Sequence, residues 1–175
     1  MPKIAALREK YKLHLKVERY TDECPREKSV IRKAESQDVG RIAEIEIFNY
    51  RLNFYPIFRN DEFYFSEMQV LSAAEELRRN GLEDTYVYDD GVVKGFIRLE
   101  GTQVKKLFVE PVLQGQGIGA KLLDYAVQSH RADHLWALEK NTKAIAFYAR
   151  HGFYPTGRKE LEEDTDESLI ELKKA

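Results

Sequence analysis

Residues 103–128 read QVKKLFVEPVLQGQGIGAKLLDYAVQ, and this stretch determines how the rest of the chain is interpreted. Hydrophobic alternation predicts a β-strand over Val104–Val109, with Leu107 and Val109 on the same face. Pro111 ends this strand, because a residue without a backbone N–H cannot extend a central strand. The stretch therefore begins with a buried strand.

A glycine-rich turn follows the strand and leads into an amphipathic helix. Gly115, Gly117 and Gly119 alternate along the turn, and the helix carries its apolar face at Leu122, Leu123, Ala126 and Val127. Alternating glycines before a helix leave its first N–H groups uncovered, and the positive end of the helix dipole attracts anions. The turn is therefore interpreted as a site for a phosphate or pyrophosphate.

The composition is typical of one ordinary soluble domain. Of the 175 residues, 43% are hydrophobic and 33% are charged, and the net charge of −2 gives no support for nucleic-acid binding. No apolar run is long enough for a secretory signal or a membrane span, so no membrane partner is expected. A single cysteine, Cys24, cannot form an internal disulfide, which favours a reducing, cytoplasmic location. The four histidines lack metal-ligand spacing, so no metal is predicted.

The chain is divided into an N-terminal extension with a linker, residues 1–28, and a domain, residues 29–175. In the extension, apolar residues fit both helical and strand spacing, so its secondary structure stays open. The segment Thr21–Ser29, which contains Pro25, is typical of a linker. The extension is expected to pack on the domain or on a neighbouring subunit, and a homodimer is one possible arrangement.

The domain is expected to have an α+β fold. The element order is β-α-α-β-β-β-α-β-α-β-β, which predicts a mixed, mostly antiparallel twisted sheet of six or seven strands, flanked by about four helices, with a β-α-β crossover at the glycine turn. Outside residues 103–128, strands are expected at 30–34, 85–88, 92–100, 134–139, 156–161 and 168–172, and helices at 36–51, from 66 or 67 to 80, and at 141–150. Ser36 is the expected N-cap of the first helix, and Asn80-Gly81 the αL stop of the second.

Two known glycine motifs fit the turn poorly. A P-loop requires a hydroxyl residue after its lysine, and Lys121 is followed by leucine. A dinucleotide fingerprint fits residues 115–120 as G-x-G-x-x-A, and Glu139 ends the next strand where a ribose-binding acid belongs. However, Glu110–Gln114 separate the turn from its strand, and the chain has too few βα units for a doubly wound sheet. Both interpretations are set aside.

A third interpretation comes from Gln114-x-x-Gly117-x-Gly119, which resembles the Q/R-x-x-G-x-G/A signature of the GCN5-related N-acetyltransferases, the GNAT superfamily. Two segments, VKKLFVEPVLQGQGIGAKLL and LEKNTKAIAFYARHGFYPTGRKEL, look like the acetyl-coenzyme A core of that superfamily in order and spacing. The resemblance covers about residues 29–172. It implies an N-acetyltransferase that moves an acetyl group from acetyl-CoA to a primary amine of a small molecule, peptide or protein by direct attack in a ternary complex. The alternative is a non-catalytic sensor or interaction module that binds acetyl-CoA or CoA.

The resemblance also implies which residues hold the co-substrate. Backbone groups of the strand 104–109 would bind the pantetheine arm, and backbone N–H groups of the turn would bind the pyrophosphate. Asn141 would bind the pantetheine or a bound water, and its position also fits an ordinary helix N-cap. The predicted cofactor-binding residues are Leu107, Phe108, Val109, Gln114, Gly115, Gln116, Gly117, Ile118, Gly119, Ala120, Asn141 and Tyr148.

Tyr148 and Glu110 are the predicted catalytic residues. By the resemblance, Tyr148 protonates the departing coenzyme A thiolate, a task that suits a phenol because it is protonated at neutral pH. The local pattern around Tyr148 is also typical of a half-buried core tyrosine. The attacking amine must lose a proton, and Glu110 is favoured as the base over Glu100 and Glu139, although no motif decides between these strand-end glutamates.

The aromatic segment between Phe48 and Phe65 is expected to form the acceptor side. Most of its aromatic residues are expected in the core and a few in a pocket, where Asp61 or Glu62 would attract a cationic amine. The sequence does not identify the acceptor.

Overall fold

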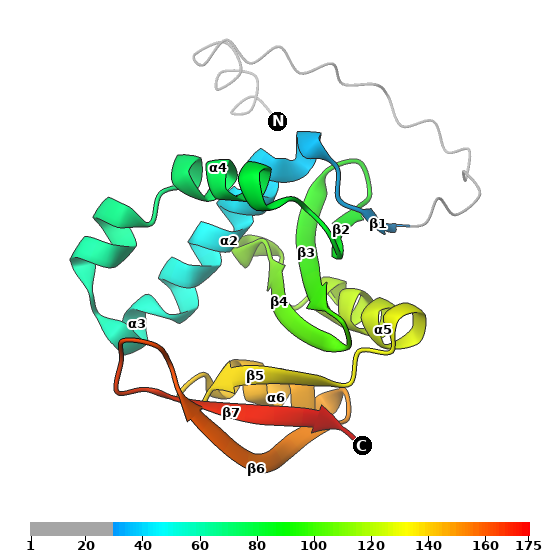
Figure 1. The fold of residues 1–175 in the computed structure, drawn as a ribbon. Coiled ribbons are helices and arrows are strands. Elements are labelled where there is room, and N and C mark those ends of the chain that lie inside the picture. The colour runs from blue at the N-terminus through cyan, green and yellow to red at the C-terminus, as the bar shows by residue number, and fades with distance from the viewer. Residues whose placement is uncertain (1–29) are drawn as a thin grey trace, which may run out of the picture.

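Seven strands form one sheet in the order β1-β2-β3-β4-β5-β7-β6 (Figure 1). The computed structural model describes residues 30–175, so the predictions for the extension, its linker and Cys24 lie outside the described residues. All neighbouring strands are antiparallel except β4 and β5, which confirms the predicted mixed, mostly antiparallel sheet. The strands are β1 (Ile31–Lys33), β2 (Thr85–Asp89), β3 (Val93–Glu100), β4 (Gln103–Val109), β5 (His134–Leu138), β6 (Phe153–Leu161) and β7 (Ser168–Lys174).

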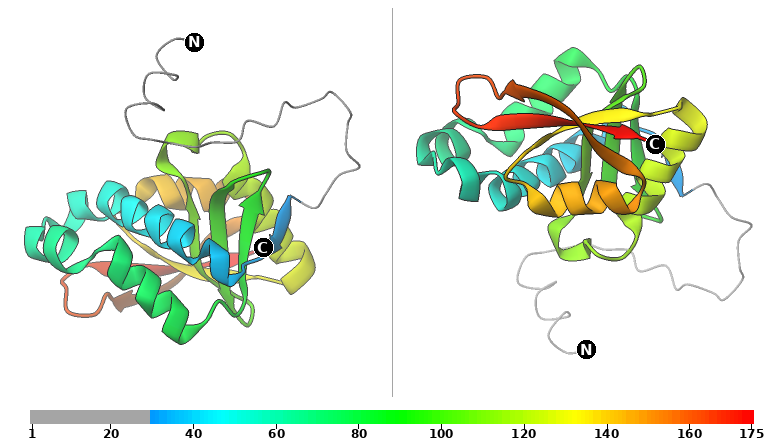
Figure 2. Two further views of the ribbon diagram at one scale, coloured as in Figure 1. Left: turned by 90° about the horizontal axis from the view of Figure 1, so that it is seen from above. Right: turned by 90° about the horizontal axis from the view of Figure 1, so that it is seen from below.

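Helices cover both faces of the sheet (Figure 2). In the described part these are α2 (Val39–Asn53), α3 (Tyr55–Phe58), α4 (Val70–Asn80), α5 (Ile118–His130) and α6 (Thr142–Arg150), with short turns η1 (Ser36–Asp38), η2 (Glu62–Glu67) and η3 (Pro111–Leu113). One core lies between the sheet and helices α2 and α4, and contains Phe96. The other lies between the sheet and helices α5 and α6, and contains Leu122 and Tyr148. No helix within residues 30–175 is long and apolar enough to cross a membrane.

Several predicted helix and strand ends differ from those in the structure. Ser36 does not cap the first helix; the Asp38 carboxylate accepts the backbone N–H of Glu35 at 2.8 Å. The second helix begins at Val70, since the six residues of η2 form a π-helical turn of their own. Gly81 has φ 80° but ψ 176°, which is not the αL conformation. Strand β6 begins at Phe153, three residues before the expected start.

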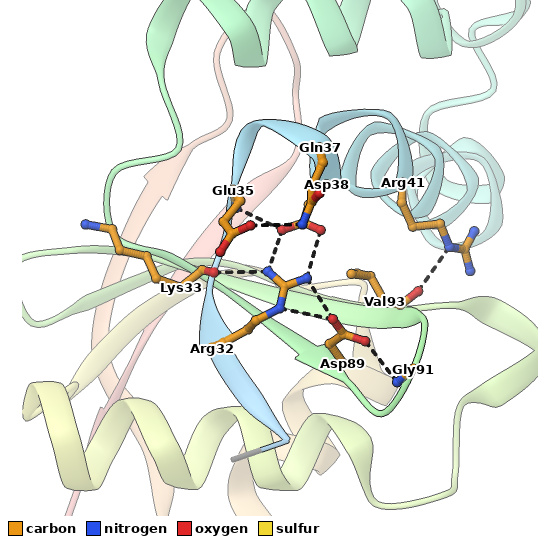
Figure 3. A network of polar contacts seen from close by, with 9 residues as sticks. All are labelled: Arg32, Lys33, Glu35, Gln37, Asp38, Arg41, Asp89, Gly91 and Val93. Carbon is orange, nitrogen blue, oxygen red and sulfur yellow. Dashed lines mark hydrogen bonds and ion pairs between the residues drawn. The ribbon is translucent and has the colours of Figure 1, made fainter. Parts of the chain in front are cut away.

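A partly buried ion-pair network joins β1, β2 and the start of α2 (Figure 3). Arg32 donates from Nη1 and Nη2 to the two carboxylate oxygens of Asp38, at 2.7 and 2.9 Å, and from Nε to Asp89 at 3.0 Å. Asp38 is only 5% exposed. The hydrogen bond from Arg32 holds the pKa of the Asp38 carboxyl below its usual range, against the opposing effect of burial. The network therefore fixes where α2 leaves the sheet.

We expect Asp38→Asn to lower the free energy of unfolding by about 1–3 kcal/mol at pH 7, because it removes the charge that Arg32 binds. Since the folded-state pKa of Asp38 is lowered, its contribution is fully present above the unfolded pKa of about 4 and is lost as the pH falls through the folded value. Urea unfolding at pH 7 and pH 3 measures both values. The exposed pair of Asp90 and Lys94 is the control, and Asp90→Asn should change stability by less than about 0.5 kcal/mol. An equal effect of Asp38→Asn at both pH values would contradict this account.

Candidate active site

Strands β4 and β5 part soon after they meet. They pair only at Gln103↔His134 and Val104↔Leu135. Beyond this point β4 stays paired with β3 through Val109, and β5 stays paired with β7 through Leu138. In the described part of the chain, the later residues of β4 therefore have a partner strand on one side only.

A β-bulge accounts for this separation. In the β3–β4 pair, Arg98 is opposite Lys106 but Leu99 is opposite Val104, so Lys105 is an extra residue in β4. A bulge bends its strand and increases the local twist. From Lys106 onward β4 consequently follows β3 and leaves β5.

The free edge of β4 presents backbone groups to the gap. The N–H of Glu110 donates to the carbonyl of Lys94 at 2.8 Å, so Glu110 faces β3. Because successive residues of a strand alternate in the direction of their backbone groups, Leu107 and Val109 face away from β3. An unpaired strand edge is a template for an extended ligand.

The buried side chain of Asn49 closes the end of this edge. Asn49 is 1% exposed and donates from Nδ2 to the carbonyls of Ile45 at 2.8 Å and Val109 at 2.9 Å. Gln114 donates to Asn49 Oδ1 at 3.0 Å, so the Gln114 side chain is engaged within the protein. The sequence analysis assigned no role to Asn49. A polar amide at an inward-facing position of α2 was the signal that could have identified it.

The predicted glycine turn lies directly before helix α5. Gly115 and Gly117 have φ values of 80° and 81°, in the left-handed region, and Gly117 is the N-cap residue of α5. The first N–H groups of α5, from Ile118 to Ala120, have no intrahelical acceptor. At Gly119, an added Cβ would lie 3.5 Å from the Phe147 ring and 3.6 Å from Val109, so α5 runs close to both α6 and β4 at this position.

Asn141 and Tyr148 are positioned by α6. Asn141 Oδ1 accepts the N–H of Ala144 at 3.2 Å, so the N-cap interpretation is confirmed. Tyr148 is 8% exposed and packs between Phe147 and Phe153, with ring centroids 5.2 and 6.1 Å away. Its hydroxyl makes no hydrogen bond to any residue in 30–175. Burial raises the pKa of Tyr148, so its phenol stays protonated at neutral pH.

The three candidate glutamates all form ion pairs. Glu110, at the end of β4, binds Arg41 of α2 at 2.6 Å. Glu139 binds Lys159 at 2.6 Å just after β5, on the other side of the gap. Glu100 binds Lys105 at 3.0 Å, at the end of β3 where β4 and β5 are still paired. Glu110 and Glu139 thus lie where β4 and β5 have separated, and Glu100 lies near the point where these two strands are still paired. Residues 30–175 contain no group of three or more acidic, histidine or cysteine side chains that could hold a metal ion.

The aromatic segment lies against the free half of β4, but most of it is not core. Tyr50 packs on Phe54 and Phe108, at centroid distances of 4.9 and 5.6 Å. Tyr64 is the buried aromatic residue of the segment, at 3% exposed. The expectation that most of these residues are buried was wrong, since Phe48, Phe63 and Phe65 are 39%, 40% and 49% exposed. Asp61 accepts a hydrogen bond from the Tyr55 hydroxyl at 2.8 Å.

Comparison with known proteins agrees with this geometry. A family model described as an acetyltransferase (GNAT) domain matches residues 69–155, which include the parting strands, the glycine turn and Tyr148. The chain belongs to the GNAT superfamily. A curated relative, peptidyl-lysine N-acetyltransferase YjaB of Salmonella typhimurium, is 36% identical over 77 residues, covering 44% of this chain and 53% of YjaB. The match therefore spans about half the length of such curated relatives.

Solved structures of GNAT proteins share the fold over most of the chain. The apo form of YjaB from Escherichia coli superposes with a TM-score of 0.63 at 21% identity, covering 82% of this chain and 95% of YjaB. The PaiA N-acetyltransferase of Thermoplasma acidophilum, solved with coenzyme A, superposes with a TM-score of 0.55 at 20% identity, covering 82% and 97%. At these identities the similarity establishes the fold alone.

We expect Asn49→Ala to lower the free energy of unfolding by about 1–3 kcal/mol, because it removes the shorter of the two side-chain hydrogen bonds to the Val109 carbonyl, at 2.9 Å against 3.4 Å from Gln114. Chemical denaturation measures this loss. Asn53, on the same helix, is the control, because its side chain makes one longer bond, 3.3 Å to Asn49. Asn53→Ala should cost less than about 1 kcal/mol. Equal losses for the two variants would exclude the role given to Asn49.

Proposed function

We propose that this GNAT protein is an acetyl-CoA-dependent N-acetyltransferase that acetylates a primary amine by direct attack. The early separation of β4 from β5, beside an uncovered helix N-terminus, is the observation that carries this proposal. An extended arm fits the free edge of β4, and an anion fits the N–H groups of the turn. Acetyl-CoA joins these two features in one molecule. Solved relatives with coenzyme A or acetyl-CoA bound support the same co-substrate.

In this proposal, backbone groups of Leu107 and Val109 align the pantetheine arm, and a nearby N–H polarises the thioester carbonyl. The backbone N–H of Val109 is available for this hydrogen bond, whereas the carbonyl of Val109 already accepts one from Asn49. Donors of this kind stabilise the charge that develops on the thioester oxygen as the amine attacks, typically by about 3–4 kcal/mol each. The N–H groups from Gln116 to Ala120 hold the pyrophosphate, and Asn141 binds the arm from the start of α6.

Proton transfer completes the reaction. The amine nitrogen bonds to the carbonyl carbon, the carbon–sulfur bond breaks, and Tyr148 donates its proton to the departing thiolate. A buried phenol that no other residue in 30–175 engages is suited to this role. Glu110 remains the proposed base, directly or through water, and its ion pair with Arg41 fixes its carboxylate against α2. The cytoplasmic location and the homodimer remain predictions.

We expect Tyr148→Phe to lower kcat by about one to three decades, because it removes the proton donor and retains the packed ring. Steady-state kinetics measure kcat, and calorimetry should find acetyl-CoA binding within about twofold of wild type. Tyr154→Phe is the control, since Tyr154 is 53% exposed on β6. An unchanged kcat in Tyr148→Phe would exclude the general-acid role.

A panel of acceptors tests the function itself. Thiol release from acetyl-CoA is followed with small amines, lysine-containing peptides and peptides with free N-termini, in parallel with thermal stabilisation by acetyl-CoA. The lysine peptides are included because curated relatives are peptidyl-lysine N-acetyltransferases. We expect stabilisation by acetyl-CoA and thiol release with at least one class of acceptor. Stabilisation without turnover on any amine would favour the alternative of a non-catalytic acetyl-CoA-binding module.

A further inference from the structure

Lys106 lies on the expected acceptor side of the free edge of β4. It is the first residue of β4 after the bulge and is opposite Arg98 of β3. Side chains alternate between the two faces of a strand, and Phe108 packs with the core between the sheet and helices α2 and α4. Lys106 therefore points to the same face, and its Nζ lies 5.8 Å from the centroid of the Tyr50 ring on α2.

Aromatic rings continue the surface beside Lys106. Tyr50 packs on Phe54 and Phe108, at centroid distances of 4.9 and 5.6 Å, and the ring centroids of Phe54 and Phe108 are 6.3 Å apart. Each of these three rings, like Lys106, is partly exposed. We call Lys106, Tyr50, Phe54 and Phe108 the lysine–aromatic patch. The patch presents an apolar surface with a cation beside it.

The ammonium group of Lys106 is positioned by one carboxylate and keeps free donors. The Glu46 carboxylate of α2 binds it, and only 10% of the Glu46 side chain is exposed, against 29% of the Lys106 side chain. An ammonium group can donate three hydrogen bonds, and within residues 30–175 Glu46 is the acceptor of the one that Lys106 donates. Two donors of Lys106 are therefore available to a ligand.

Arg98 adds a second positive charge next to Lys106. Its Nε donates to the Thr85 hydroxyl at 3.1 Å. Its guanidinium forms no ion pair with any residue in 30–175, and its Nη2 is sealed from solvent without a hydrogen-bond partner. Two neighbouring cations are thus matched by one bound carboxylate, that of Glu46. Because a buried cation without a counter-charge is unfavourable, this arrangement favours an anion beside the exposed donors of Lys106.

The patch lies where the proposed co-substrate would present its thioester. In the proposed function, the pyrophosphate binds at the turn after β4, and the arm extends back along the free edge past Val109 and Leu107. The arm then ends near the point where β4 and β5 part, beside Lys106. Helices α5 and α6 cover the other face of the sheet, where Leu107 packs. An acceptor therefore approaches from the face that carries the lysine–aromatic patch.

We propose that the lysine–aromatic patch binds a carboxylate group of the acceptor, so that the preferred substrates are amines that also carry a carboxylate. This inference rests on the proposed function, because the patch is placed relative to bound acetyl-CoA. The carboxylate accepts charge-assisted hydrogen bonds from the free donors of Lys106, and the positive charge of Arg98 favours it further. The rings of Tyr50, Phe54 and Phe108 contact the apolar part of the acceptor.

Three pairs of acceptors test this proposal: glycine, 3-aminopropanoate and 4-aminobutanoate, each with its neutral amide. The three lengths scan the spacing between the amine and the carboxylate. Since the members of a pair differ in intrinsic reactivity, the ratio of kcat/KM for the acid to kcat/KM for the amide is compared between wild type and variants. We expect Lys106→Gln to lower this ratio about tenfold for at least one length, because it removes charge-assisted hydrogen bonds to the carboxylate.

Lys105→Gln is the matched control. Lys105 is the preceding residue of the same strand, its side chain is 44% exposed, and it is paired with Glu100. This substitution keeps the bulge residue in place and should leave the ratio within about twofold of wild type. Lys106→Arg keeps the positive charge and should keep the ratio within about threefold, a rescue that a purely structural role of Lys106 would not explain.

A double variant guards against a folding defect. Lys106→Gln alone leaves the buried Glu46 carboxylate without its cation, whereas Lys106→Gln combined with Glu46→Gln replaces the ion pair by two amides. Circular dichroism and thermal unfolding establish that each variant folds. We expect the double variant to lower the ratio to the same extent as Lys106→Gln.

Two lysine peptides identify the source of the carboxylate. They differ only in an aspartate or an asparagine beside the lysine. A preference that depends on Lys106 and is confined to the small acids assigns the subsite to free amino carboxylates. A preference for the aspartate peptide assigns it to an acidic residue of a peptide, and either result supports the inference.

The outcomes separate this inference from the proposed function. A ratio that the folded double variant leaves unchanged, for all three lengths and for the peptide pair, would overturn the inference and leave the acetyltransferase function intact. Acetylation of the amides without acetylation of any acid would do the same. Absence of thiol release with these acceptors and with the wider panel would overturn both proposals.

Discussion

The extra residue in β4 is the constraint on which the rest of the structure depends. Because Lys105 has no opposite residue in β3, β4 turns with β3 and gives up its pairing with β5 after two residue pairs. A fully paired β4 would have no free edge, and the crossover helix α5 would lie against a closed sheet. The bulge thus converts the middle of a continuous sheet into an accessible strand edge.

Side-chain contacts position the elements around the free edge of β4. Asn49 binds the carbonyl at the end of the free edge, and Gln114 binds Asn49 in turn. On β3, Gly95 allows α5 to approach closely, since a Cβ there would lie 3.3 Å from Ile118 Cγ2 and from Leu122 Cδ1. The buried amides therefore fix the end of the free edge, and a small residue on β3 makes room for the crossover helix.

The features that were predicted correctly from the sequence depend on local backbone preferences. The central strand, the glycine turn before a helix and the Asn141 cap each depend on a few neighbouring residues, and each was found as expected. The features that were missed depend on contacts between segments far apart in the chain. The Arg32 network joins β1 to Asp89 of β2 and to the start of α2, and Asn49 binds the Val109 carbonyl of β4. The π turn at η2 is a separate case, because no proline or glycine within Glu62–Glu67 marks it in the sequence.

This difference has a physical basis in the two sides of the site. The proposed co-substrate side consists mainly of backbone groups. It requires particular φ values and an unpaired strand edge, and glycines and hydrophobic alternation indicate these in the sequence. The side proposed for the acceptor depends on side chains of segments far apart in the chain, as where Tyr50 of α2 packs on Phe108 of β4, and such segments meet only in the fold. The nature of the acceptor is thus encoded in tertiary contacts, and a local motif can identify the acetyl donor while leaving the acceptor undefined.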